Sequence, residues 1–311
     1  MEKYKYIFGP IPSRRLGLSL GVSTIPQKYC NYSCVYCQLG RTSHLTNDRK
    51  EFYSVLDILD EFKNYIKKSP KFDVVTLVGE GEPTLYSNLK ELTLGIKKIT
   101  SKPIALITNG SLLNNIDVQK DLEDIDILLP SLDAYDIDSF RKIHRPYGKI
   151  HYEDTIQGLI DFSHIFKGQI WLEIMLLDEL NDDAKSIIKI KDIISKIKYT
   201  KIYINTVVRP PAEPWVKKAS KDAINMAVNI LGGVSIDALK EGGFYSEIKD
   251  NYEAILSIIK RHPMNQHELK VFLKSRNCEN NDISNIYNKL KDDKNVEALE
   301  FKGYFTYRAI M

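Results

Sequence analysis

The sequence predicts an α/β fold: a parallel sheet, curled into a partial barrel or left open, followed by a smaller C-terminal unit. Six short runs rich in Val and Ile alternate with longer segments of helical spacing, and strands buried on both faces have this composition. Successive βα units of this kind imply a parallel sheet covered by helices. The strands are expected at residues 18–23, 72–78, 104–108, 125–132, 170–177 and 201–207.

Helices are expected between these strands, where apolar residues recur every three or four positions. One apolar face falls within residues 55–66, a second within 89–99 and a third within 187–197. In folds built this way, functional loops follow the carboxyl ends of the strands. We therefore expect any active site at that edge of the sheet.

Composition and length are those of an ordinary folded protein. The chain has 311 residues, enough for one large and one small domain, and its net charge is +3. That charge neither requires nor excludes a nucleic acid partner. No apolar run approaches the ~18 residues needed to cross a bilayer. The sequence therefore predicts a cytoplasmic protein with no membrane association.

The most informative motif is the run of three cysteines Cys30, Cys34 and Cys37, with Tyr36 directly before the last. Three thiolates on one short loop can bind three irons of a [4Fe–4S] cube and leave the fourth iron open. A disulfide framework does not fit three clustered cysteines. A structural zinc site, with His44 as fourth ligand, stays open as an alternative. Zinc sites, however, favour two separated pairs of ligands.

Other suggestive segments follow the next strands. The second strand is followed by the Gly-rich turn 79–84 (GEGEPT) and the third by residues 108–110 (TNG). Glycines let backbone approach a ligand closely, although such a turn is usually only a turn. Ser131 and Asp133 end the fourth strand and suit ribose hydroxyls, or could equally cap a helix. Their common position beside the cysteine loop favours a binding site.

These motifs together resemble the radical S-adenosylmethionine (radical SAM) superfamily. The cysteine spacing, GEP and TNG carry the resemblance, which covers roughly residues 7–215. Residues 9–17 (GPIPSRRLG), 38–42 (QLGRT) and 209–211 (RPP) are similar to a group placed beside the wyosine-type tRNA-modifying enzymes. The resemblance implies a partial (β/α)6 TIM-like barrel over residues 1–240.

The resemblance also implies a chemistry and a set of ligands. The three cysteines would bind one [4Fe–4S] cluster, whose open iron chelates S-adenosylmethionine (SAM). An electron from a flavodoxin- or ferredoxin-type donor would cleave SAM to a 5′-deoxyadenosyl radical that abstracts a substrate hydrogen. Tyr36 would pack near the adenine or simply shield the cluster. The remaining SAM contacts would come from Gly81, Glu82, Pro83, Asn109, Ser131 and Asp133.

Basic residues near strand ends are candidates for substrate binding. Arg14, Arg15, Arg145 and Arg209 could bind a phosphate or carboxylate. For any one of them, an ordinary surface position is the simpler interpretation. Glu173 lies inside an apolar strand, where an unpaired charge is costly, so it is expected to pair with an arginine or SAM, or to lie at the sheet end.

The C-terminal unit, residues 245–311, is predicted to be winged-helix-like. Three helices are expected at 252–261, 267–274 and 282–291, followed by a hairpin of strands 296–301 and 304–310. Many domains of this kind bind nucleic acid, but this unit has only 11 Lys and Arg against 10 Asp and Glu. Protein docking or a dimer contact is an equal alternative. Cys278 is expected to be a small buried residue.

Two hypotheses for function follow. The first is a radical SAM enzyme with one cluster and an unidentified substrate, RNA or peptide. Wyosine-forming enzymes carry a second cysteine set, which this chain lacks, so wyosine itself is not the expected product. The second is a non-catalytic iron–sulfur redox sensor whose C-terminal winged helix binds DNA. The GEP and TNG segments favour the enzyme, because a sensor needs no SAM site.

Overall fold

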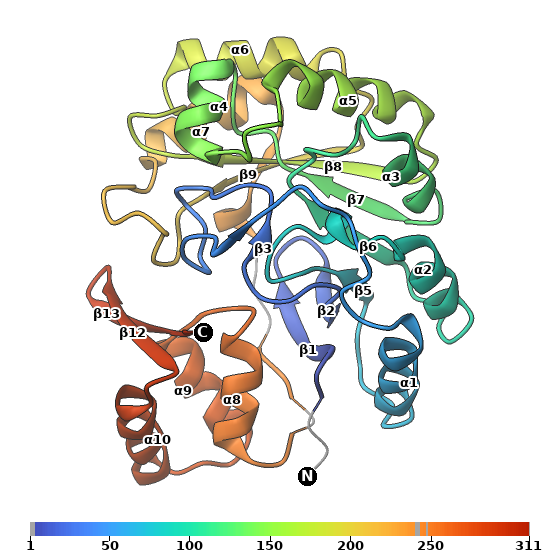
Figure 1. Cartoon of the computed structure of the whole chain (residues 1–311). Helices are drawn as coiled ribbons and strands as arrows, with labels where there is room; N and C mark the ends of the chain where they lie inside the picture. Colours follow the sequence, from blue (N-terminus) through green and yellow to red (C-terminus); the bar gives the residue numbers. More distant parts are fainter. Residues whose placement is uncertain (1–3, 240–242, 247, 311) are drawn as a thin grey trace.

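A mostly parallel eight-stranded sheet organises the larger part of the chain (Figure 1). The computed structural model describes residues 4–239, 243–246 and 248–310. The strand order is β1-β2-β5-β6-β7-β8-β9-β10; β1 is antiparallel to β2, and every other neighbouring pair is parallel. The strands are β1 (Ile7–Ser13), β2 (Gly17–Val22), β5 (Val74–Leu77), β6 (Ile104–Thr108), β7 (Ile127–Pro130), β8 (Gln169–Leu176), β9 (Lys201–Thr206) and β10 (Val234–Ser235). The predicted α/β class and all six predicted strands are confirmed.

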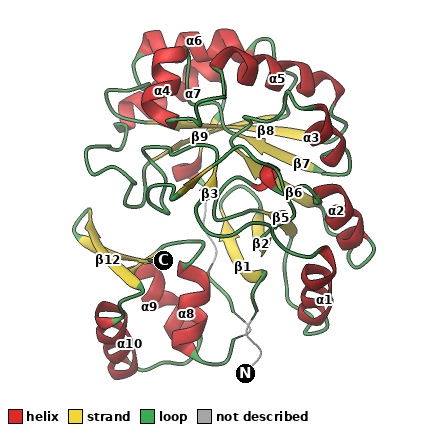
Figure 2. Ribbon diagram, in the orientation of Figure 1, coloured by secondary structure: helices red, strands yellow, loops and turns green. Residues whose placement is uncertain are grey.

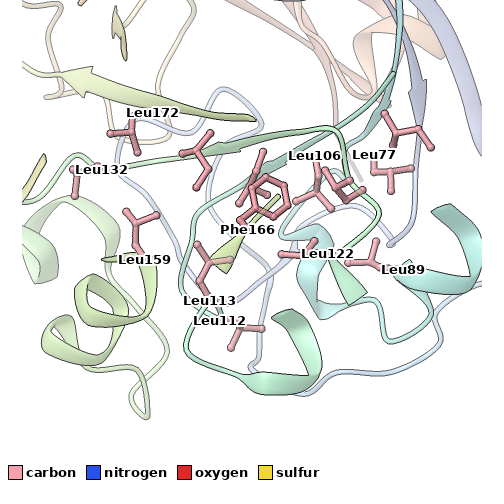
Figure 3. Close-up of a cluster of buried hydrophobic side chains, with 14 of the residues drawn as sticks. Leu77, Leu89, Leu106, Leu112, Leu113, Leu122, Leu132, Leu159, Phe166 and Leu172 are labelled. Carbon is pink, nitrogen blue, oxygen red and sulfur yellow. The ribbon is translucent and has the colours of Figure 1, made fainter. Parts of the chain in front are cut away.

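Successive residues of each strand face opposite sides of this sheet, and the helices cover one of these two sides. Leu77, Leu106 and Leu172 pack against the helices in the main core (Figure 3), whereas Ala105, Leu129 and Tyr203 form a smaller cluster with other inward residues. The helices are α1 (Val55–Ile66), α2 (Leu89–Lys97), α3 (Ile116–Asp121), α4 (Ile137–His144), α5 (Tyr152–Ile165), α6 (Ala184–Ile194) and α7 (Lys221–Leu231). The three helices expected from apolar spacing correspond to α1, α2 and α6.

Two strands of the main sheet were not expected from the sequence. The first is β1, where Pro10 and Pro12 argue against a central strand. Proline is tolerated at a sheet edge, because an edge strand needs fewer backbone donors, and β1 has that position. The second is the two-residue β10, which lies beyond β9 at the other edge and is too short to give a sequence pattern.

The C-terminal unit consists of three helices and a small sheet, and it packs against β1 (Figure 2). Its elements are α8 (Asn251–Ile259), β11 (Met264–Asn265), α9 (Gln266–Ser275), α10 (Asn280–Asp292), β12 (Val296–Phe301) and β13 (Tyr304–Ala309), with strand order β11-β13-β12. The three predicted helices and the predicted hairpin are confirmed. The expected boundary between residues 240 and 245 includes residues 240–242, which lie outside the described residues.

The core of the C-terminal unit extends onto the main sheet. Phe8 and Ile11 of β1 belong to the same buried cluster as Ile255 and Phe272. Cys278 is buried in this core, as expected, and accepts a hydrogen bond from Asn251 Nδ2 at 2.9 Å. Within the described ranges, no helix is both long and apolar enough to span a membrane.

Candidate active site

The three cysteines lie on one loop after the carboxyl end of β2, as the sequence predicts. Cys30 ends the short strand β3 (Tyr29–Cys30), which pairs with β4 (His44–Leu45). The loop then turns tightly: the Cys37 N–H donates to the Cys34 carbonyl at 3.1 Å, and the Gly40 N–H donates to the Cys37 carbonyl at 3.1 Å. All three cysteines are half-buried and free of disulfides.

The donor set fits an iron–sulfur cluster better than a single metal ion. Burial raises the pKa of the Cys34 and Cys37 thiols, so their thiolates require a positive partner in this environment. In the described part of the chain, no three His, Cys, Asp or Glu side chains form a group that could bind one ion. Each thiolate of a [4Fe–4S] cube binds a different iron, so such convergence is not needed. His44, the proposed zinc ligand, is exposed and stacks on Tyr29 at 4.2 Å.

The GEP turn is joined to the cysteine loop through its backbone. The Glu82 N–H donates to the Tyr29 carbonyl at 3.1 Å, and the Lys28 N–H donates to the Glu80 carbonyl at 2.6 Å. A Cβ on Gly81 would lie 1.7 Å from the Tyr29 carbonyl oxygen, so only glycine fits. Pro83 begins the short 3₁₀ turn that leads away from this contact. The turn is therefore fixed directly against the residue that precedes Cys30.

The Glu82 side chain links the turn after β5 to the carboxyl end of β6. Its carboxylate is buried and accepts bonds from Thr84 N (3.0 Å), Thr84 Oγ1 (2.6 Å), Thr108 Oγ1 (2.6 Å) and Asn109 N (2.8 Å). Burial raises the pKa of Glu82, and these four donors oppose that effect. These bonds link Thr84 of the GEP turn to Thr108 and Asn109 of the TNG turn, so Glu82 positions the two turns relative to one another.

Asn109 connects the TNG turn back to the cysteine loop. Its Nδ2 donates to Asn31 Oδ1 at 2.7 Å and lies 3.9 Å from Cys30 Sγ. Asn31 is fully buried, and its own Nδ2 donates to Ser111 Oγ at 2.7 Å and to Asn47 Oδ1 at 2.9 Å. Asn31 was not singled out from the sequence, because its role depends on partners 16 and 80 positions away.

Tyr36 and Asp133 form a second polar group beside the cysteines. The Tyr36 hydroxyl donates to Asp133 Oδ2 at 2.5 Å, and the Met175 N–H donates to Asp133 Oδ1 at 2.7 Å. Burial raises the pKa of Asp133 to about 6 despite these bonds. His144 lies between this carboxylate (Nε2–Oδ2 3.8 Å) and Cys34 (Nδ1–Sγ 3.4 Å).

His144 is a site residue that the sequence analysis missed. It ends α4, directly before Arg145, and burial lowers its pKa to about 3, so its ring is neutral. The backbone of the same segment also contacts the loop, since the Ser33 N–H donates to the His144 carbonyl at 2.9 Å. Only its neighbour Arg145 was singled out from the sequence, for its charge.

A cavity of about 370 Å³ lies on the inner side of the sheet and reaches the cysteine loop. Tyr36 and Cys37 line it, together with Ile107, Met175 and Asn205 from the strands. The lining does not include Gly81, Glu82, Pro83, Asn109, Ser131 or Asp133. Ser131 directly follows β7 and forms a parallel β-bridge with Glu173 of β8.

Glu173 lines the cavity and forms an ion pair with Arg15, which confirms one of the alternatives expected for this residue. Asn205 Nδ2 donates to the other Glu173 oxygen at 2.9 Å. Burial lowers the pKa of Arg15 to about 10, so the side chain stays charged at neutral pH. The cavity therefore contains a half-buried ion pair on the inner face of the sheet.

The other candidate arginines are also paired. Arg14 lines the cavity and contacts Asp237 at 3.1 Å. Arg209 lines it too, but donates to the C-terminal unit: to Pro263 O (2.7 Å) and Glu268 Oε1 (3.0 Å), with His262 Nε2 at 2.7 Å. Arg145 is not in the lining and donates to Glu213, which Arg41 also contacts.

Fold and site together define the class of protein: the chain belongs to the radical SAM superfamily, whose family model matches residues 24–190. Members of this superfamily are enzymes that use a [4Fe–4S] cluster and SAM and need an electron donor. The resemblance to the radical SAM superfamily that the sequence motifs indicate is thereby confirmed.

Individual relatives place the chain more closely. It is 35% identical over 308 residues to the UPF0026 protein MJ1312 of Methanocaldococcus jannaschii, covering 96% of this chain and 94% of that protein. It is 34% identical over 310 residues to a protein of Brachyspira hyodysenteriae named GTPase Obg, covering 98% of this chain but only 45% of that relative.

A solved structure of TYW1 with a lysine-pyruvate adduct bound is similar in fold. Its TM-score is 0.52 at 23% identity, over 72% of this chain and 75% of that chain. The likeness extends to the fold alone.

Proposed function

We propose that this protein is a radical SAM enzyme with a single [4Fe–4S] cluster bound by Cys30, Cys34 and Cys37. The observation that carries the proposal is the shared cavity: Cys37 and Tyr36 line the same cavity as the half-buried Arg15–Glu173 pair. When bound, the reduced cluster and SAM supply a carbon-centred radical that removes a hydrogen atom from a substrate. The barrel residues position both partners and exclude water.

The chain's own groups divide into those that face SAM and those that hold them in place. Backbone at Gly81, Glu82 and Pro83 would receive the amino group of SAM, since Gly81 already contacts the loop before Cys30. Asn109, Ser131 and Asp133 are the candidates for the ribose and carboxylate. Tyr36 lines the cavity and is the candidate for the adenine.

A single cluster agrees with the position of the fourth cysteine. Cys278 lies in the core of the C-terminal unit, where Asn251 donates to its sulfur. It is therefore placed to pack rather than to bind a second cluster, and wyosine formation is not proposed.

For the substrate we favour a peptide over an RNA. Four arginines line the cavity, Arg14, Arg15, Arg209 and Arg261, and each contacts a carboxylate of the protein. Paired guanidinium groups bind phosphates weakly, because the phosphate must displace the carboxylate. This cavity has a volume of about 370 Å³ and suits a weakly charged group better than a nucleic acid backbone.

We propose further that residues 1–240 form the catalytic unit and residues 245–311 a winged-helix-like unit. Three helices followed by the β12–β13 hairpin support this comparison. The unit places Arg261 and His262 in the cavity lining, which supports a role in closing the active site. A cytoplasmic flavodoxin- or ferredoxin-type protein is the proposed electron donor.

The rival function is an iron–sulfur redox sensor whose winged-helix-like unit binds DNA. One assay separates the two: anaerobically reconstituted protein, dithionite and SAM, scored for 5′-deoxyadenosine. We expect formation that is lost in Cys34→Ser. No 5′-deoxyadenosine from a protein with a reducible cluster would refute the enzyme, and zinc in anaerobically purified protein would refute both functions.

Pull-down under anaerobic conditions tests the substrate class. We expect the full chain to retain peptides rather than RNA. RNA retained by the wild type, and lost when Arg209→Gln is introduced, would contradict the peptide proposal.

A further inference from the structure

The C-terminal hairpin places a guanidinium group against the cysteine loop. Arg308 of β13 lies with its Nη1 3.5 Å from the carbonyl oxygen of Gln38, the residue after Cys37. A Cβ on Gly40 would lie 3.5 Å from the Cζ, Nη1 and Nη2 atoms of Arg308. The guanidinium therefore covers the Cys37–Gly40 turn. Two units far apart in the sequence meet at this point, since the contact joins residues 270 positions apart.

The ion-pair partner of Arg308 is more exposed to solvent than Arg308 itself. Arg308 Nε donates to Glu297 Oε2 on β12 at 2.7 Å. The Arg308 side chain is 15% exposed and the Glu297 side chain 36% exposed. Water and salt screen the more exposed carboxylate more strongly. The field at the loop is therefore dominated by the cation, not cancelled by the pair.

We propose that Arg308 raises the reduction potential of the cluster that this loop binds. The inference rests on the proposed function, which assigns Cys37 as a cluster ligand. One-electron reduction adds a negative charge to the cluster, and a fixed nearby cation stabilises that reduced form more than the oxidised form. Net charge and solvent exposure are among the factors that set such potentials. Arg308 supplies the charge, and its hairpin covers the turn.

Through this contact the C-terminal unit becomes part of the cluster's electrostatic environment. Arg308 is a positioning residue of the redox centre and is not expected to touch SAM or substrate, since it lies outside the cavity lining. A merely structural role for the hairpin contact would change stability or cluster loading. It would leave the potential of the loaded protein unchanged.

The test is a redox titration of anaerobically reconstituted full-length protein without SAM, followed by electron paramagnetic resonance. For Arg308→Gln we expect the reduced-to-oxidised ratio at a fixed potential to fall about tenfold, a shift of ~59 mV to more negative values. Arg308→Lys keeps the charge and should shift less. Glu297→Gln removes the opposing charge and should shift the potential in the positive direction.

The matched control is Lys270→Gln, which removes one charge from an exposed position on α9 of the same unit. Its potential should equal that of the wild type. Equal potentials for wild type and Arg308→Gln at full cluster loading would overturn the inference, as would an equal shift in the control. If Arg308→Gln does not fold, the opposite-sign shift of Glu297→Gln decides the matter. A wild-type protein that binds no cluster would overturn the proposed function itself.

Discussion

Replacing Glu82 by glutamine should loosen the two turns that meet at the cysteine loop. The carboxylate accepts three hydrogen bonds at Oε1 and one, from the Asn109 N–H, at Oε2. A glutamine amide must place its NH2 group at one of these positions, where it faces a donor. At Oε2 this leaves a backbone N–H unpaired, which costs about 1–3 kcal/mol, and the charge-assisted part of the other bonds is also lost. We expect a total loss of about 2–3 kcal/mol.

Thermal unfolding of the apoprotein measures this loss. At roughly 2–4 °C per kcal/mol for a chain of this size, Glu82→Gln should lower Tm by about 4–12 °C. Thr108→Val removes one donor to the same carboxylate and should lose about 1 kcal/mol. Glu91→Gln, on the exposed side of α2, is the control and should change the free energy of unfolding by less than ~0.5 kcal/mol. Should Glu82→Gln unfold at the same temperature as the control, Glu82 does not hold the two turns together.

Three further outcomes follow from the site. Cys34→Ser should fold normally but retain well under half of the wild-type iron after reconstitution; full iron content would contradict its assignment as a ligand. Because Asp133 has a folded pKa of about 6, above its unfolded value, it contributes stability below about pH 4 that is lost as pH rises through 6. The Tm of Asp133→Asn should therefore rise relative to that of the wild type between about pH 4 and pH 6 and the difference should level off above pH 6; a pH-independent difference would contradict the shift. Arg209→Met breaks bonds to Pro263 and Glu268 and should speed proteolysis of the C-terminal unit several-fold, whereas an unchanged rate would show that these bonds do not fix it.

The strands and the cysteine loop could be predicted because their signals are local. Buried parallel strands are short continuous apolar runs, and the cysteine spacing lies within eight residues. By contrast, β1 could not be predicted, because its two prolines are compatible only with an edge position that the sequence does not reveal. A strand's place in a sheet depends on residues far away.

Side-chain roles in the site were harder to predict for the same reason. The GEP motif drew attention to this turn, but nothing local showed that Glu82 bonds to a strand end 26 positions further along. His144 carries no motif, and it reaches Cys34 only because α4 returns to the loop across 110 positions. The arginines were identified from their charge, whereas their carboxylate partners are visible only in the folded chain.

The paired arginines change how the C-terminal unit is understood. A nucleic-acid-binding unit would present unpaired cations outward, yet Arg209 and Arg261 are bonded across the boundary between the two units, Arg209 to Glu268 and Arg261 to Glu80 at 3.0 Å. Ion pairs that cross a boundary and are largely buried favour one arrangement of the two parts, since separating them would leave charges in partly desolvated sites. The same boundary encloses the cavity and brings Arg308 to the cysteine loop. These contacts support the proposed role of the unit in closing the active site rather than in binding nucleic acid.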